Sequence, residues 1–357
     1  MVRFADFIKD RHEIKSYDPS DTEGLSKGDP GVQESQIYEA LSETQIQKIR
    51  GGKVTSPPRA LFGSNTKIGA VYRKFWENAL EIRNHVEQDG PINPLPVLTG
   101  LHDVIAKDLI EKLYQYAMCA SMDSDDLIRH TIDVTFTALM VGKGMPYDVR
   151  MQLKLGLAAF LENVGMYRIP ARILKKGPVK KEEITTILDH PKRSYDILSR
   201  MGEKFQWLAE VALQVHERSD GSGYPYGLTM GEIYELSSII GLVDTYIAMI
   251  GERPYREKLV STNAIRFIVE DAKNLFPLKI RKVFLKQISL FPVNTLVRLN
   301  NKSIGRVLAT DHKRTMRPLI EILYDGDGNK LEKRELVSLS ENPLLYITGC
   351  VDDKELP

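Results

Sequence analysis

HERSDGSGYPYGLTMGEI, at residues 216–233, is followed closely by IIGLVDTYIAMIGERPYRE at residues 239–257. The first stretch is crowded with glycine and proline, which permit or fix backbone angles outside helices, so it predicts a turn-rich loop. The second stretch is apolar at helical spacing and contains a carboxylate, Asp244. The pair therefore predicts a loop that starts at His216 and leads into a helix, within a helical domain.

Other imidazole and carboxylate side chains are spread over about 115 residues around this loop, in DDLIRHTIDV, AAFLENVG and ILDHP. Each histidine lies in or ends an apolar helical segment. A first-row metal centre needs several such nitrogen and oxygen donors, brought together from separate helices. Composition and spacing alone leave two interpretations open, a metal pocket or ordinary core and surface histidines.

The chain before this region divides into two parts. Residues 1–65 are polar and broken by Gly, Pro and Ser, which predicts a mostly flexible leader with one short helix across about 35–50. From residue 66 the apolar spacing becomes helical: IGAVYRKFWENALEIRNHVEQ predicts one helix and LTGLHDVIAKDLIEKLYQYAMCA a second. We expect His102 and Asp103, on the second helix, to form a satisfied surface pair.

After about residue 290 the pattern changes to short runs rich in β-branched residues: TLVRLNN, IGRVLAT, PLIEILYD, ELVSLS and LLYITGCV. The turn formers DGDGN between the third and fourth runs indicate a hairpin. Five short strands in about 65 residues favour a small barrel or a twisted sheet packed on the helical body.

Overall composition excludes several classes of protein. Lys plus Arg number 49 and Asp plus Glu 48 in 357 residues, so no basic excess points to a nucleic-acid partner. The two cysteines, Cys119 and Cys350, lie far apart and predict no disulfide framework. The N-terminus has no apolar signal stretch, and no segment is long enough to span a bilayer. We therefore expect a cytoplasmic protein with no membrane contact.

The upstream pattern G-x-x-x-x-P-x-x-I-L-x-K, from Gly165 to Lys176, completes a signature with the two stretches quoted first. Over about residues 120–290 the chain resembles the HD-GYP family. Members of that family are metal-dependent phosphodiesterases that hydrolyse cyclic di-GMP, and their helical bundle holds two or three iron, manganese or similar ions. The resemblance implies a mainly α fold.

The implied organisation has four parts. A flexible leader (1–65) and a helical segment (66–122) precede an HD-GYP bundle (123–290), and a small barrel-like β domain of five short strands (291–357) follows it.

The resemblance also implies a partial set of metal ligands. The positions that match it are His130, His190, His216, Asp244 and, for a third ion, Asp126. The His-Asp pair that names the family falls on Glu162 and Asn163, and the first histidine of its His-His-Glu triplet is Val215. The resemblance therefore assigns no catalytic residue, because these three degenerate positions lack the side chains of the family.

The positions that would contact a ligand are better preserved. They comprise the loop residues and three basic side chains that face substrate phosphates in the family: Asp220, Gly223, Tyr224, Pro225, Lys176, Arg253 and Arg256. Arginine can clamp phosphate oxygens bidentately, although the glycines also suit a plain turn and an arginine can simply brace a helix.

These departures favour an impaired hydrolase. The family aspartate bridges two cations, whereas Asn163 offers one carbonyl oxygen and no charge. The loss removes attraction on the order of 4 kcal/mol per ion at an effective dielectric constant near 20. One ion, Fe²⁺, Mn²⁺ or Mg²⁺, could still bind His130, Glu162 and Asp244.

Three functions stay open at this stage. The chain could be a cyclic di-GMP receptor or interaction module, an active phosphodiesterase with an unusual metal site, or a pure scaffold. Other signalling proteins and a second copy of the chain are further candidate partners.

Overall fold

The structure is a computed structural model that describes residues 66–119, 126–174, 181–251 and 261–289, together with 291, 293, 295–310, 314, 316–351 and 356. The expected leader at 1–65, with its short helix at 35–50, lies outside the described residues.

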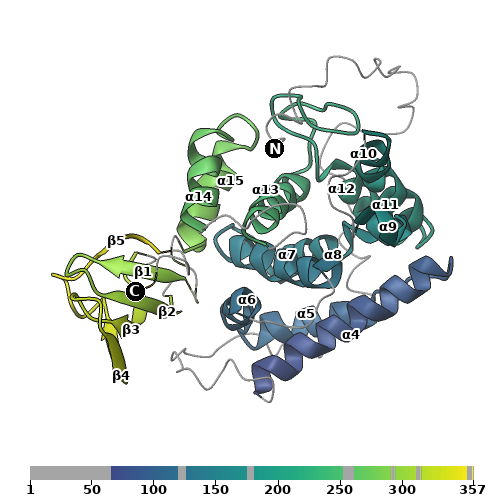
Figure 1. The fold of residues 1–357 in the computed structure, drawn as a ribbon. Helices are drawn as coiled ribbons and strands as arrows, with labels where there is room; N and C mark the ends of the chain where they lie inside the picture. The colour runs from purple at the N-terminus through teal and green to yellow at the C-terminus, as the bar shows by residue number, and fades with distance from the viewer. Residues whose placement is uncertain are drawn as a thin grey trace.

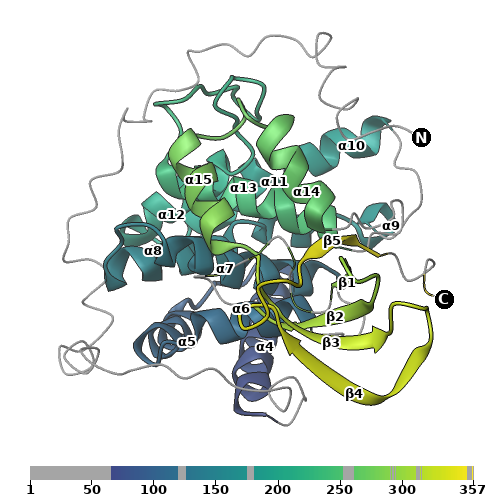
Figure 2. The same cartoon turned by 90° about the vertical axis from the view of Figure 1, so that its left-hand side faces the viewer.

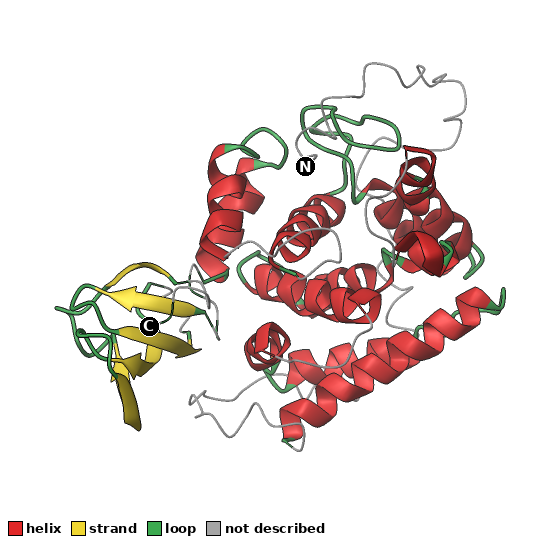
Figure 3. Cartoon of the chain, viewed as in Figure 1, coloured by secondary structure: helices red, strands yellow, loops and turns green. Residues whose placement is uncertain are grey.

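The described chain is mainly helical and ends in a small antiparallel sheet, which confirms the expected fold class (Figure 3). Its α-helices are α4 (Lys67–Glu87), α5 (Leu95–Ala106), α6 (Ile110–Cys119), α7 (Asp126–Lys143), α8 (Val149–Leu161), α9 (Ala171–Leu174), α10 (Lys181–Leu188), α11 (His190–Ser199), α12 (Gln206–Gln214), α13 (Glu235–Ile250), α14 (Ser261–Glu270) and α15 (Leu278–Gln287). Two 3₁₀ turns join them, η5 (Val164–Arg168) and η6 (Glu203–Phe205). Within the parts of the chain that are described, no helix is long and apolar enough to cross a membrane.

The N-terminal helices follow the expected periodicity with one difference. Thr66 caps α4 by accepting a hydrogen bond from the backbone N–H of Gly69 at 3.0 Å. The second expected helix is instead two helices, α5 and α6. The chain turns between them at Asp108, whose φ of 47° lies in the left-handed region that a helix cannot continue through.

The expectation that His102 lies at the surface is wrong. Its side chain is buried on the core side of α5, and Nε2 has no hydrogen-bond partner among the described residues. Asp103 does face solvent, where it accepts from Lys107 one turn later. The two neighbours point in different directions because successive helical residues are rotated by about 100°.

Helix α7 runs through the middle of the helical body. It packs against α8, α6, α13 and α4, and Figure 1 shows it between α4 on one side and α13 on the other. Its side chains Phe136 and Leu139 are fully buried. A helix enclosed in this way holds its polar side chains in fixed positions, and one of them is His130.

The C-terminal strands are β1 (Leu296–Leu299), β2 (Ile304–Ala309), β3 (Leu319–Tyr324), β4 (Lys330–Ser338) and β5 (Ile347–Cys350), in the order β4-β3-β2-β1-β5. The five expected runs each form a strand, and DGDGN makes the β3–β4 hairpin, with Asp325 accepting from the N–H of Asn329. Because β4 and β5 are the two edges, the sheet is open and not a closed barrel.

The sheet lies to one side of the helical body in Figure 1, and that side faces the viewer in Figure 2. Gln115 on α6 donates a hydrogen bond to the carbonyl of Thr310, which follows β2, at 3.0 Å.

Candidate metal centre

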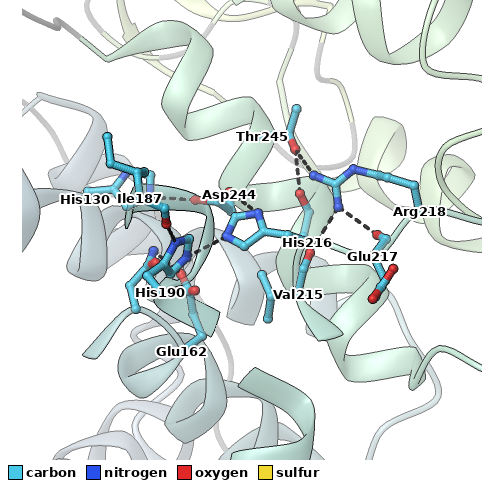
Figure 4. Close-up of polar contacts among 12 residues, drawn as sticks. His130, Glu162, Ile187, His190, Val215, His216, Glu217, Arg218, Asp244 and Thr245 are labelled. Carbon is cyan, nitrogen blue, oxygen red and sulfur yellow. Dashed lines mark hydrogen bonds and ion pairs between the residues drawn. The ribbon is translucent and has the colours of Figure 1, made fainter. Parts of the chain in front are cut away.

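Donor side chains from five separate elements meet beside α7 (Figure 4). His130 comes from α7, and Glu162 and Asn163 from the end of α8. His190 begins α11, His216 follows the end of α12, and Asp244 lies in α13. Glu162, His190 and His216 lie at helix ends, whereas His130 and Asp244 project from within α7 and α13.

The first half of the centre contains His130, Glu162 and Asp244. One donor atom from each lies within 4.8 Å of the others, and all three side chains are buried. Nε2 of His130 is 2.7 Å from Oδ1 of Asp244. One oxygen of Glu162, Oε2, has no hydrogen-bond partner among the described residues. A buried carboxylate oxygen without a partner is costly unless something else satisfies it, so this group fits a divalent ion.

The two carboxyl groups of this half titrate in opposite directions. Burial raises the pKa of Glu162 well above its ordinary value, and the nearby charge of Asp244 raises it further. Burial also opposes ionisation of Asp244, but the hydrogen bond and charge of His130, together with the charges of His216 and Arg218, outweigh it and hold the pKa of Asp244 below its usual range. Without an ion, the centre therefore favours the protonated form of Glu162 and the ionised form of Asp244.

Asn163 stands where the resemblance places the bridging aspartate. Its Nδ2 donates to Oε1 of Glu162 at 2.6 Å. The amide thus donates a hydrogen bond to Glu162, and it brings no negative charge to the centre.

The second half of the centre is a pair of imidazoles. Nδ1 of His190 lies 2.6 Å from the carbonyl of Ile187, and since a carbonyl only accepts, that nitrogen carries the ring proton. Nε2 of His190 then presents a lone pair to Nε2 of His216, which lies 2.9 Å away and donates to it. Burial lowers the pKa of both rings, to about 4 for His190 and well below the ordinary value for His216.

Asp244 lies between the two halves. Its Oδ1 faces His130, and its Oδ2 lies 3.9 Å from Nδ1 of His216, too far for a hydrogen bond (Figure 4). Val215, where the resemblance expects another histidine, is 1% exposed and belongs to the apolar core. The second half therefore has two nitrogen donors and no carboxylate of its own.

The turn-rich loop closes against this second half. The rings of His216 and Tyr224 are stacked, with centroids 4.8 Å apart and planes 3° apart. Asp220 faces solvent, where its Oδ1 accepts from the backbone and hydroxyl of Ser222. Gly223 and Pro225 flank Tyr224 in the same loop, and among these predicted ligand-binding residues Tyr224 contacts the imidazole pair.

Several predicted positions lie outside what is described. Lys176, Arg253 and Arg256 fall in the gaps of the described chain, and only the backbone of Asp126 is described.

Sequence reasoning placed Glu217 in the triplet but missed the contacts around the histidines: those of the carbonyl of Ile187, the carboxylate of Glu217 and the guanidinium of Arg218. Arg218 donates to two carbonyls and to Thr245. The polar triplet His216-Glu217-Arg218 at a helix end was the only available signal.

Two family models match the chain. One, described as an HD domain, matches residues 115–277, and the other, described as a KOW domain associated with HD domain, matches residues 296–357.

Similar proteins include three cyclic di-GMP phosphodiesterases. The one from Pseudomonas aeruginosa is 26% identical over 244 residues, which is 68% of this chain and 59% of that protein. The one from Borreliella burgdorferi is 27% identical over 64% of this chain and 60% of its own. The one from Thermotoga maritima is 34% identical over 44% of each. The chain thus spans 60% or less of the length of these relatives.

A solved HDG"Y"P protein from Bdellovibrio bacteriovorus is 16% identical and aligns with a TM-score of 0.45, over 67% of this chain and 76% of that one.

Proposed function

This chain is an HD-domain protein of the HD-GYP type, and from that premise we propose that it binds cyclic di-GMP at a metal centre too depleted for efficient hydrolysis. The nucleotide is proposed from the relatives, which are cyclic di-GMP phosphodiesterases, and the impairment from the donor set of this chain. Binding of the nucleotide and impairment of hydrolysis are independent, and each has its own measurement.

The amide of Asn163 carries the proposal of impairment. Its Nδ2 is engaged by Glu162 at 2.6 Å, so a hydrogen-bond donor occupies the position of a bridging carboxylate. Two divalent ions a few ångströms apart repel each other, and an anionic bridge offsets that repulsion. Losing one unit-charge contact at about 4 Å costs on the order of 4 kcal/mol per ion, or about three decades of affinity.

The second half of the centre reinforces this conclusion. It has the neutral rings of His190 and His216, and the side chain at 215 is a buried valine. Two imidazoles without a carboxylate form a weak site for an ion, because the remaining coordination positions must come from water.

The first half supports a second candidate function, a slow phosphodiesterase with one ion. His130, Glu162 and Asp244 offer three donors within 4.8 Å, a set that suits Mn²⁺, Fe²⁺ or Mg²⁺. A divalent ion supplies positive charge for a phosphoryl oxygen and lowers the pKa of a water molecule. One ion does this for only one side of the reacting phosphate, so the expected turnover is low.

Three measurements on one preparation test both functions. Elemental analysis gives the metal content after purification with Mn²⁺. Calorimetric titration with cyclic di-GMP gives binding, and chromatography of the linear dinucleotide gives hydrolysis. Binding with one ion or fewer and little product supports the proposal. Two ions with rapid hydrolysis overturns the impairment, and no binding with or without Mn²⁺ overturns the receptor function.

A further inference from the structure

We propose that Glu217 is a positioning residue that fixes the ring of His216 through the loop at residues 218–228. The inference deepens the proposed function and rests on it for its biological meaning, because His216 is one of two imidazoles in the second half of the metal centre. Glu217 accepts its hydrogen bonds from the loop, and it is not a member of the donor group formed by His130, Glu162 and Asp244.

The side chain of Glu217 joins the end of the loop to the residue that precedes the start of the loop. The side chain is 3% exposed, and both carboxylate oxygens accept backbone hydrogen bonds: Oε1 from Tyr226 at 2.6 Å and Oε2 from Leu228 at 2.9 Å. A buried carboxylate that satisfies two main-chain N–H groups fixes their position more firmly than a neutral acceptor does. The loop therefore returns to the residue beside His216.

The same closure presses Tyr224 against His216. The backbone N–H of Tyr224 donates to the carbonyl of His216 at 3.1 Å, and the two rings stack at 4.8 Å. Tyr224 also meets the ring of His190 nearly edge-on, at 6.5 Å and 78°. A flat ring held against one face of His216 restricts rotation of the imidazole about its Cβ–Cγ bond.

Close packing leaves the loop little freedom to relax. A Cβ at position 223 would overlap the backbone of Glu217 and Arg218, so only glycine fits there. On the other side, Arg218 donates to the carbonyls of Val215 and Glu217 at 3.1 and 2.8 Å. The backbone that carries His216 is thus held from both directions.

The result of this bracing is the placement of one nitrogen. Nε2 of His216 lies 2.9 Å from Nε2 of His190, a separation that a turn of either ring would lengthen. Groups behind the ligands of a metal centre commonly set ligand orientation in this way. In this arrangement Tyr224 restricts the ring of His216 by direct stacking.

Glu232, which follows this loop, offers a matched control. Its Oε2 accepts from the N–H and the hydroxyl of Thr229 at 3.0 and 2.7 Å, but it is exposed and these hydrogen bonds hold Thr229, outside the loop at residues 218–228. Both Glu217→Gln and Glu232→Gln remove one negative charge and replace one acceptor oxygen by an amide donor. They differ in whether the loop beside His216 is released.

The experiment uses the full chain with ¹⁵N-labelled histidine, of which there are seven. In the metal-free protein, Glu217→Gln should shift and broaden the ring signals of His216 and His190, while those of His85 and His102 stay in place. Mn²⁺ titration should show about tenfold weaker binding at the second, weaker half of the centre in Glu217→Gln. Glu232→Gln should leave both readouts as in the parent.

Tyr224→Leu covers the case in which Glu217→Gln does not fold, since it removes the stacked ring and keeps both hydrogen bonds of Glu217. Loss of the ordered His216 signals in either variant supports the inference, whereas parental spectra in the folded variants overturn it. A parent that shows ordered His216 signals yet ignores cyclic di-GMP would overturn the proposed function and leave this inference standing.

Discussion

Nε2 of His190 lies 2.9 Å from Nε2 of His216, and the carbonyl of Ile187 fixes which of the two rings donates. The contact joins α11 to the end of α12 inside the protein. His190 must stay uncharged for it to persist, because a proton added to that ring would give Nε2 a hydrogen that faces the hydrogen of its partner. The pair therefore makes the stability of the bundle depend on pH.

The first prediction concerns acid stability. Burial lowers the pKa of His190 to about 4, against about 6.5 in the unfolded chain. Between these values the unfolded chain binds more protons, so the free energy of unfolding falls as the pH falls from 6.5 towards 4. The loss at pH 4.5 is about 3 kcal/mol from His190. Urea denaturation of the parent and His190→Gln at pH 7.5 and 4.5 measures it.

His190→Gln should be less stable than the parent at pH 7.5, and the difference should shrink at pH 4.5. His85→Gln on α4, which changes a histidine outside the centre, is the control and should track the parent at both pH values. If the free energies of unfolding of the parent and of His190→Gln fall equally between pH 7.5 and pH 4.5, the pKa of His190 is not lowered by folding.

The second prediction concerns Asp133, a buried carboxyl group on the face of α7 towards α4. Burial raises its pKa to about 7, although Arg129, 3.5 Å away, lowers it in part. The folded state therefore keeps a proton that the unfolded chain releases near pH 4, and stability falls as the pH rises from 4 to 7. Asp133→Asn cannot ionise and should gain about 3 kcal/mol relative to the parent between pH 5 and pH 8.

Denaturation of both proteins at pH 5, 6.5 and 8 gives this relative gain, since histidine effects common to the two cancel. An unchanged difference at all three pH values would show that Asp133 is already ionised when folded. One oxygen of Asp133 and the hydroxyl of Tyr72 lack hydrogen-bond partners among the described residues.

The elements with a regular period could be predicted from the sequence. The apolar spacing of α4 and the β-branched runs of the five strands reflect which face is buried, and burial shapes each residue choice along the element. The break between α5 and α6 could not, because Asp108 takes a left-handed conformation that several residue types tolerate and that no proline or glycine announces.

The donors of the centre were predicted through a resemblance, but their mutual contacts were not. His190 and His216 are 26 residues apart, and Glu217 binds backbone N–H groups that every residue possesses. Hydrogen bonds to backbone N–H groups do not constrain which side chains the sequence carries at the donor positions, so the sequence does not predict them. The burial of His102 was missed for a related reason, since one polar residue on the inner face of an apolar helix reads like a residue at its edge.

The third prediction tests whether Mn²⁺ binds at the first half of the centre. Asp244 is the carboxyl group there with a lowered pKa, because the hydrogen bond and charge of His130 and the charges of His216 and Arg218 together outweigh its burial. Asp244→Asn keeps the shape and removes the charge, and should weaken Mn²⁺ binding by about three decades. Calorimetric titration measures the change. Asp133→Asn, a buried carboxyl group on α7 outside the centre, should bind Mn²⁺ as the parent does; equal affinities in all three proteins would place the ion elsewhere.

The last prediction restores the donor set. Glu162→His, Asn163→Asp and Val215→His together return the carboxylate bridge and two imidazoles to the positions that the resemblance assigns to them. The aspartate offsets the repulsion between two ions, so metal content by elemental analysis should rise to two Mn²⁺ per chain, and hydrolysis of cyclic di-GMP should rise with it.

Val215 is the demanding position, because its side chain is buried in the core and histidine is larger, at a cost of about 1–3 kcal/mol in stability. The double variant at 162 and 163 provides the comparison, since it restores the bridge without disturbing the core. A folded triple variant that holds no more metal than the parent would show that the helix ends have moved apart, and that the centre was lost in its backbone as well as in its side chains.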